Sequence, residues 1–160
     1  MAGRVEMQTG FLFVLKYIEY FIIFFMMVNH VRSTDQIKRF VFCLFLTCFI
    51  ASIIGILQIP AGGRVSAPFE GEMGEPNTFG GYLLFIGVVA AGLLARTDHS
   101  GTKQILVLLI LCIIPPFLFT QSRTSYLALI PALLALGFMA DRRIILVGVL
   151  MVSFLVSPPP

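Results

Sequence analysis

The chain has 160 residues, of which 58% are hydrophobic and only 12% are charged, and its mean hydropathy is +0.98. This composition excludes an ordinary soluble domain and is typical of an integral membrane protein. The net charge of +3 does not indicate a nucleic-acid partner, because the basic residues are scattered in ones and twos between apolar segments. The three cysteines lie in apolar runs without a CxxC motif or a nearby histidine, so we expect no metal site.

Six apolar stretches approach the roughly 20 residues that a helix needs to cross the hydrocarbon core. They cover about residues 11–31, 40–59, 78–95, 104–119, 124–140 and 144–157. Pro115 and Pro116 should kink or end the fourth stretch, and Pro131 should bend the fifth. We therefore predict an all-α fold: one polytopic membrane helix bundle over residues 1–160, with about six transmembrane helices.

The connections between these stretches carry Lys and Arg unequally. One set of alternate connections holds Arg32, Lys38, Arg39, Arg96, Lys103, Arg142 and Arg143. The other side holds only Arg4, Arg64 and Arg123. The positive-inside rule places the richer set in the cytoplasm, so we expect both termini, the loop at 60–77 and the turn at 120–124 to face outward.

Two of these outward segments carry the residues of a possible anion site. The first contains Arg64 and the helix start at Pro76 and Asn77, and the second is the turn Ser122-Arg123. We expect Asn77 and Ser122 to cap the helices that follow them, so that two helix N-termini and two arginines share one membrane face. Arginine binds phosphate bidentately and stays charged, which favours a pyrophosphate ligand. Single arginines near helix ends also snorkel to lipid headgroups, and that alternative stays open.

Three glutamates in the first segment have the chemistry of a general base or of metal ligands. Their loop is rich in glycine and offers no fixed His or Asp partner. We therefore interpret Glu70 and Glu72 as solvated loop residues. Glu75 lies directly before Pro76 and remains a candidate for shaping the pocket.

A small transporter, or a membrane fragment without catalytic function, is the alternative interpretation. Lys16 and Glu19 are three residues apart in the first apolar stretch, and intramembrane charges and proline-broken helices are also features of transporters. However, the polar residues gather at the outer edge, and no inverted repeat is visible. These two observations favour the anion site.

The segment EPNTFGGYLLF, followed about forty residues later by TQSRTSYLALI, resembles the core of the O-antigen ligase and O-antigen polymerase superfamily over about residues 40–140. The resemblance implies an inverting glycosyltransferase of lipopolysaccharide and polysaccharide biosynthesis in the inner (plasma) membrane. The donor would be a glycan on undecaprenyl diphosphate at the outer face. The acceptor would be lipid A-core in a ligase or another glycan in a polymerase, and the sequence does not choose between them.

The resemblance also assigns roles to residues of this chain. Arg64 and Arg123 would bind the donor phosphates, with no metal or other cofactor. Pro76 and Asn77, with Glu75 and Ser122 beside them, would shape the same pocket. Members of this superfamily have more membrane spans and, after the matched region, a large outward loop with a catalytic histidine and a further arginine. We therefore expect a truncated or partial member whose catalytic residues are not supplied by this sequence.

Overall fold

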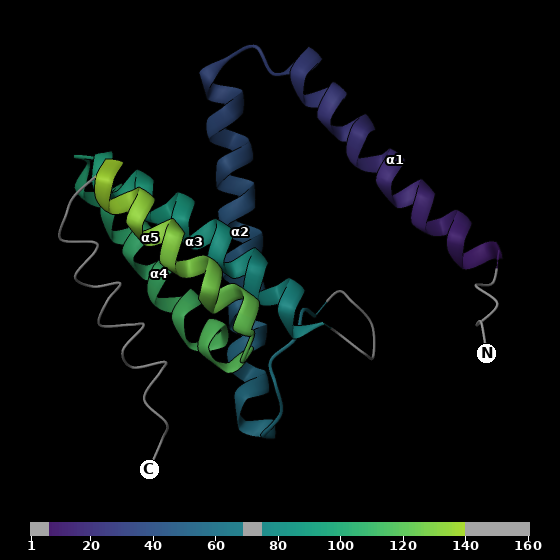
Figure 1. Ribbon diagram of the computed structural model, residues 1–160. Helices are drawn as coiled ribbons and strands as arrows, with labels where there is room; N and C mark the ends of the chain where they lie inside the picture. Colours follow the sequence, from purple (N-terminus) through teal and green to yellow (C-terminus); the bar gives the residue numbers. More distant parts are fainter. Residues whose placement is uncertain (1–6, 69–74, 140–160) are drawn as a thin grey trace. The chain divides into compact units, whose positions relative to one another are not determined.

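The computed structural model describes residues 7–68 and 75–139, and every regular element within these ranges is helical (Figure 1). The elements in chain order are α1 (Met7–His30), α2 (Thr34–Gln58), the 3-10 helix η1 (Ile59–Ala61), α3 (Pro76–Arg96), α4 (Ser100–Phe119) and α5 (Arg123–Met139). The chain divides into two compact units, Met1–Phe42 and Cys43–Pro160, and each is described by itself. The all-α prediction is confirmed.

Three of the helical segments are long and apolar enough to cross a membrane, by length and composition. They are Thr34–Ala61, Pro76–Arg96 and Ser100–Phe119. Two shorter apolar helical segments, Tyr17–His30 and Arg123–Phe138, accompany them. These apolar helices indicate a membrane protein, whereas the prediction of about six spans is not confirmed. The stretch predicted at 144–157 lies outside the described residues.

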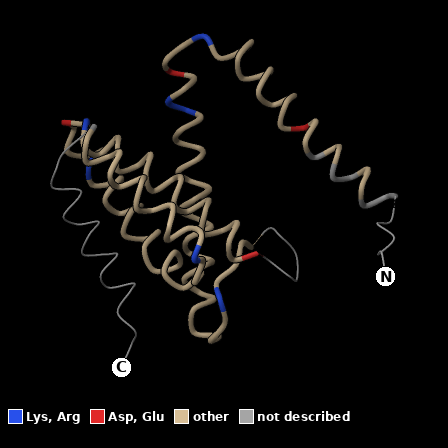
Figure 2. The backbone as a smooth tube through the Cα atoms, in the orientation of Figure 1, with Lys and Arg blue, Asp and Glu red and all other residues tan. Residues whose placement is uncertain are grey.

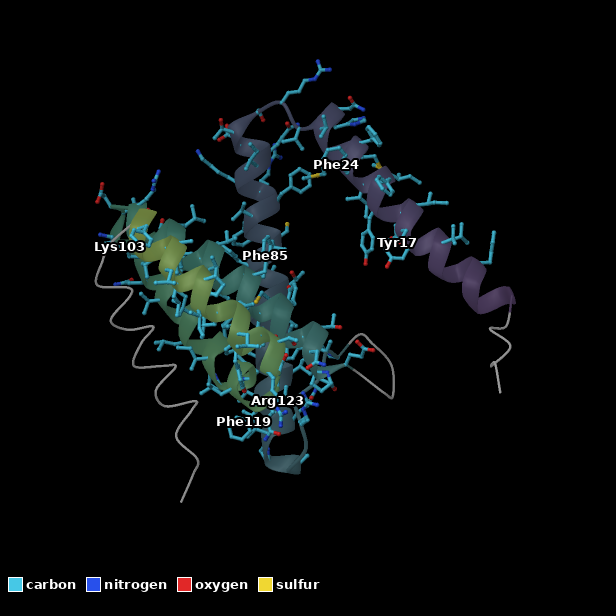
Figure 3. The ribbon with its side chains drawn as sticks, viewed as in Figure 1. Tyr17, Phe24, Phe85, Lys103, Phe119 and Arg123 are labelled. Carbon is cyan, nitrogen blue, oxygen red and sulfur yellow. The ribbon has the colours of Figure 1, made fainter. Side chains whose placement is uncertain are left out.

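The first unit contains α1 and the beginning of α2. A reciprocal pair of hydrogen bonds fixes the start of α2: the Gln36 amide donates to Ser33 Oγ (3.3 Å), and the Ser33 amide donates to Gln36 Oε1 (3.1 Å). This is a capping box, which satisfies backbone donors that the helix leaves free. It explains why α2 begins at Thr34, several residues before the apolar stretch predicted at 40–59. Tyr17 and Phe24 lie on α1 (Figure 3), and each makes an edge-to-face ring contact, with Tyr20 and Phe25 respectively.

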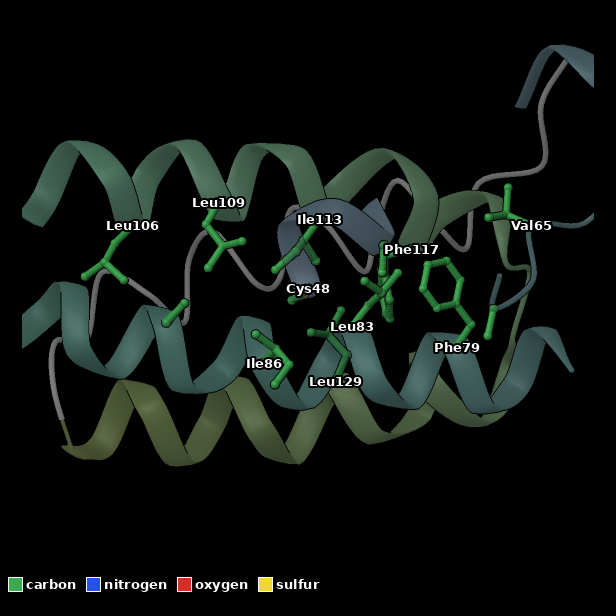
Figure 4. Close-up of a cluster of buried hydrophobic side chains, with 13 residues drawn as sticks. Cys48, Val65, Phe79, Leu83, Ile86, Leu106, Leu109, Ile113, Phe117 and Leu129 are labelled. Carbon is green, nitrogen blue, oxygen red and sulfur yellow. The ribbon is translucent and has the colours of Figure 1, made fainter. Parts of the chain in front are cut away.

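In the second unit, α3 packs against both α4 and α5. Buried apolar side chains repeat at helical spacing along the facing surfaces of these helices, and a loop residue and a residue of α2 complete the cluster (Figure 4). They include Phe79, Leu83 and Ile86 of α3, Leu106, Leu109, Ile113 and Phe117 of α4, Leu129 of α5, Val65 of the loop and Cys48 of α2. Since lipid is as apolar as these side chains, close packing rather than escape from solvent holds such helices together in a membrane.

Gly55 of α2 lies close to the last turn of α4. A Cβ atom added there would lie 2.8 Å from Pro116 Cβ, 3.1 Å from Phe79 Cε1 and 3.2 Å from Val65 Cγ1. Helix α4 runs through Pro115 and Pro116 and ends at Phe119, so the prolines occupy its last turns rather than breaking it earlier. Likewise, α5 continues through its own proline. At Gly55, the ring of Pro116 leaves no room for a side chain on α2.

We expect Gly55→Ala to lower the free energy of unfolding by about 1 to 3 kcal/mol, because the added methyl group overpacks against a proline ring that cannot rotate away. The measurement is thermal unfolding of the purified chain in detergent. Gly87→Ala is the matched control in another apolar helix, since its nearest contact would be an ordinary 3.8 Å from Ile113 Cγ2. Equal melting temperatures for the two variants would contradict this assignment.

Candidate functional site

Charged residues of the second unit lie near opposite ends of the α3–α4–α5 bundle (Figure 2). Arg96 ends α3 and Lys103 lies in the first turn of α4, at one end of the bundle. Figure 3 shows Arg123, at the start of α5, at the opposite end from Lys103. Arg64 lies at the Arg123 end, because both residues line the same cavity. The two outward-predicted arginines therefore share one end of the bundle, whereas the side of the membrane that this end faces stays a prediction.

The segment after η1 has no regular secondary structure and is bonded to the bundle at this end. Its Val65 amide donates to the Phe119 carbonyl at 3.0 Å. The side chain of Gln58 pairs with Ser66 on the other side, accepting from its amide at 3.1 Å and donating to its carbonyl at 3.3 Å. Val65 is fully buried and Ala67 nearly so. We call residues 64–67 the strap, because this segment joins the end of α2 to the end of α4.

The Arg64 side chain extends this connection to the turn between α4 and α5. Its Nε donates to the Thr120 carbonyl at 2.9 Å, and its Nη2 donates to the Gln121 carbonyl at 3.1 Å. The same Nη2 donates to Asn77 Oδ1 at 3.4 Å, in the first turn of α3. One guanidinium thus contacts the end of α4, the turn and the start of α3.

Ser122 caps the N-terminus of α5, as its sequence position predicts. The Ser125 amide donates to Ser122 Oγ at 3.3 Å, which is the bond of an N-cap. The Ser122 hydroxyl also lies 2.8 Å from Ser125 Oγ and 3.1 Å from Thr124 Oγ1. Tyr126 adds a bond from its hydroxyl to the Leu118 carbonyl at 2.6 Å. The start of α5 is therefore fixed, and Arg123 is its first residue.

The start of α3 differs from the prediction that Asn77 is the N-cap. Glu75 occupies the cap position, Pro76 is the first helical residue and Asn77 is the second. Proline suits the first position because it has no N–H to satisfy and its φ is already near the helical value. The Phe79 amide donates to the Glu75 carbonyl at 3.2 Å, so the amides outside the helical ladder are those of Asn77 and Thr78. The Glu75 carboxylate accepts from the Thr78 hydroxyl at 3.2 Å.

These elements enclose a cavity of about 470 Å³. Its lining residues are Arg64, Asn77, Gln121, Arg123 and Thr124. Three predicted site residues, Arg64, Asn77 and Arg123, therefore come together. The other three, Glu75, Pro76 and Ser122, do not line the cavity and lie instead at the starts of the helices that form it.

The electrostatics of this cavity favour an anion. Among the described residues, the lining includes two arginines and no carboxylate. Arg123 is exposed, and among the described residues none pairs with its guanidinium. The first turns of α3 and α5 contribute the positive ends of two helix dipoles. In the part of the chain that the structure describes, no group of His, Cys, Asp and Glu is arranged to hold a metal ion. Glu70 and Glu72 lie outside the described residues.

Sequence reasoning missed Gln121, Thr124 and Gly80. Gln121 has a φ of +50°, a left-handed conformation that favours glycine, and nothing in the sequence marks it. A Cβ on Gly80 would lie 2.7 Å from Ser125 Oγ, so glycine lets α3 approach the start of α5. The adjacent pair Gly80-Gly81 was a visible signal for such an approach.

No family model, curated protein or solved structure matches the chain. The resemblance to the O-antigen ligase superfamily therefore stays a prediction.

We expect Gly80→Ala to destabilise this end of the bundle by about 1 to 3 kcal/mol, because the new methyl group would also lie 3.1 Å from Ser122 Cβ and from Thr120 Oγ1. Gly81→Ala is a control one residue away in the same helix, with nothing within 4 Å of the added Cβ. Thermal unfolding in detergent should separate the two variants. A Gly80→Ala protein as stable as Gly81→Ala would show that α3 and α5 are not closely packed there.

Proposed function

We propose that this chain is part of a membrane glycosyltransferase of the O-antigen ligase and polymerase type. It would transfer a glycan from an undecaprenyl diphosphate donor to lipid A-core or to another glycan, at the outer face of the inner membrane. The observation that supports this proposal is the cavity at one end of membrane-length helices, whose described lining contains Arg64 and Arg123 and no carboxylate.

A lipid-linked diphosphate fits the position and the chemistry of this cavity. Its lipid chain lies in the bilayer, so its charged group is found near the ends of membrane-crossing helices. The cavity volume is within the range of about 300 to 1,000 Å³ that is usual for small-molecule sites. Cationic side chains and helix N-termini are the groups that bind phosphate oxygens in proteins.

The lining residues would act on the leaving group of the reaction. In an inverting transfer, an acceptor hydroxyl attacks the anomeric carbon of the donor sugar, the bond from that carbon to the diphosphate oxygen breaks, and the diphosphate leaves with the electron pair. Arg123 would stabilise the charge that develops on it. The proton of the acceptor hydroxyl would pass to a base outside this set of residues, because none of the described lining side chains is suited to take it. The cavity therefore accounts for donor binding rather than for activation of the acceptor.

A transporter receives less support from the described residues. The interior space between α3, α4 and α5 is lined by apolar side chains. Three of the buried polar residues, Thr120, Ser122 and Ser125, lie at the cavity end of the bundle rather than at its middle, and no charged side chain is buried in the described part. Glu19 lies on α1, and the Lys16 side chain is outside the description.

We expect Arg123→Ala to reduce glycan transfer by about tenfold to a hundredfold, because a charge-assisted hydrogen bond contributes about 1.5 to 3 kcal/mol. The measurement is surface glycan attachment in cells that carry the variant in the full-length protein as their only copy, normalised to the amount of protein in the membrane. Arg96→Ala is the matched control at the opposite end of the bundle and should leave transfer unchanged. Unchanged transfer for both Arg123→Ala and Arg64→Ala would overturn the proposal.

A further inference from the structure

We propose that the two arginines have different roles: Arg123 binds the phosphate groups, and Arg64 is a positioning residue that holds the turn from which Arg123 projects. This inference rests on the anion site of the proposed function and deepens it. The sequence predicts phosphate binding for both arginines, whereas this inference assigns it to Arg123 and gives Arg64 a positioning role.

The donors of Arg64 are largely committed to the protein. A guanidinium has five N–H groups: one on Nε and two on each Nη. Nε and Nη2 bond to Thr120 O, Gln121 O and Asn77 Oδ1, which uses the edge of the fork that would otherwise bind an anion bidentately. Only Nη1 has no partner among the described residues. Arg64 can therefore offer an anion one nitrogen, not a fork.

The carbonyls that Arg64 binds need a partner. The Thr120 and Gln121 carbonyls directly follow the C-terminus of α4 and lie near the negative end of its dipole. The carbonyls of Pro116, Phe117 and Leu118 accept from the amides of Thr120 and Gln121. The strap supplies partners for three further carbonyls: the Val65 amide donates to Phe119, and Arg64 donates to Thr120 and Gln121. Without Arg64, two carbonyls that lack any other partner among the described residues would turn their partial negative charge toward an anion cavity. The positive charge of Arg64 offsets the negative potential of these carbonyl oxygens, and its bonds hold the turn in place.

The turn itself requires such a restraint. Gln121 adopts a positive φ without being glycine, a conformation that costs about 1 kcal/mol or more and persists only where the surroundings hold it. Two residues later, Arg123 starts α5 with its guanidinium exposed. The position of Arg123 therefore depends on a strained turn that Arg64 holds by its backbone. Arg123 keeps a complete fork for phosphate.

Lysine distinguishes the two roles. At position 64, a single ammonium keeps the charge but cannot reproduce the planar fork that spans two successive carbonyls and Asn77. We therefore expect Arg64→Lys to lower both the melting temperature and the affinity for an anion. At position 123, the side chain forms no hydrogen bond or ion pair with a described residue, so Arg123→Ala should lower the affinity for an anion and leave the melting temperature unchanged.

The experiment is a double-mutant cycle on the full chain in lipid nanodiscs, with inorganic pyrophosphate as the probe and calorimetry as the readout. We expect Arg123→Ala to weaken binding about tenfold to a hundredfold. Arg64→Lys should weaken binding in the presence of Arg123, yet change it by less than about twofold in the Arg123→Ala background, because it acts through Arg123. Arg96→Lys is the control for an arginine-to-lysine change and should alter neither affinity nor stability.

Three results would overturn the inference. The first is a double variant whose loss of pyrophosphate affinity equals the product of the two single losses. The others are an Arg64→Lys protein with unchanged affinity, or no saturable pyrophosphate binding by the unmodified chain. If Arg64→Lys does not fold, the cycle is run with Gln58→Ala, which loosens the strap at Ser66 and does not line the cavity. The two proposals can fail separately. If the effects on pyrophosphate affinity are non-additive but Arg123→Ala and Arg64→Ala leave glycan transfer unchanged, the proposed function is overturned and this inference stands.

Discussion

The bonds from Arg64 to the Thr120 and Gln121 carbonyls determine the architecture of the cavity end of the bundle. An unsatisfied backbone group costs several kcal/mol in hydrocarbon, because no water is present to replace the missing partner. Most helices satisfy their last carbonyls locally, with a glycine turn or with water. Here local bonds satisfy the carbonyls of Pro116, Phe117 and Leu118, whereas a loop more than fifty residues earlier supplies the partners of Thr120 and Gln121, with sequence separations of 56 and 57. The cavity therefore forms only when three separate parts of the chain have folded together.

Close packing makes this arrangement possible. Gly80 allows α3 to approach the start of α5, and Gly55 allows α2 to approach the last turns of α4. Both positions would place a Cβ atom under 3 Å from a neighbouring side chain. Since helices in lipid gain little from hydrophobic burial against each other, small differences in packing distance have large effects on their association. The two glycines and the Arg64 bonds thus all depend on how closely α2, α3, α4 and α5 approach one another at this end of the bundle.

The sequence predicted the helices and the shared location of the two arginines, but not the contacts between them. Apolar runs locate α3, α4 and α5 well, because the segments between them are short and polar. The start of α2 was placed too late, since a capping box rather than hydrophobicity fixes it. Asn77 was taken as a cap because asparagine is a good one, whereas Pro76 determines where α3 begins. The bonds of Arg64 could not be predicted, because they depend on which backbone carbonyls the tertiary fold brings within reach.

The pairing of the Gln58 side chain with Ser66 has a consequence for the depth of the cavity. The Gln58 amide accepts from the Ser66 N–H and donates to the Ser66 carbonyl. It satisfies both backbone groups of this residue, as a neighbouring strand does in a β-sheet. Irregular backbone with such partners is tolerated at membrane depth when it lies against protein. The N–H and C=O groups of Ser66 therefore need no water, and the strap does not confine the cavity to the aqueous surface.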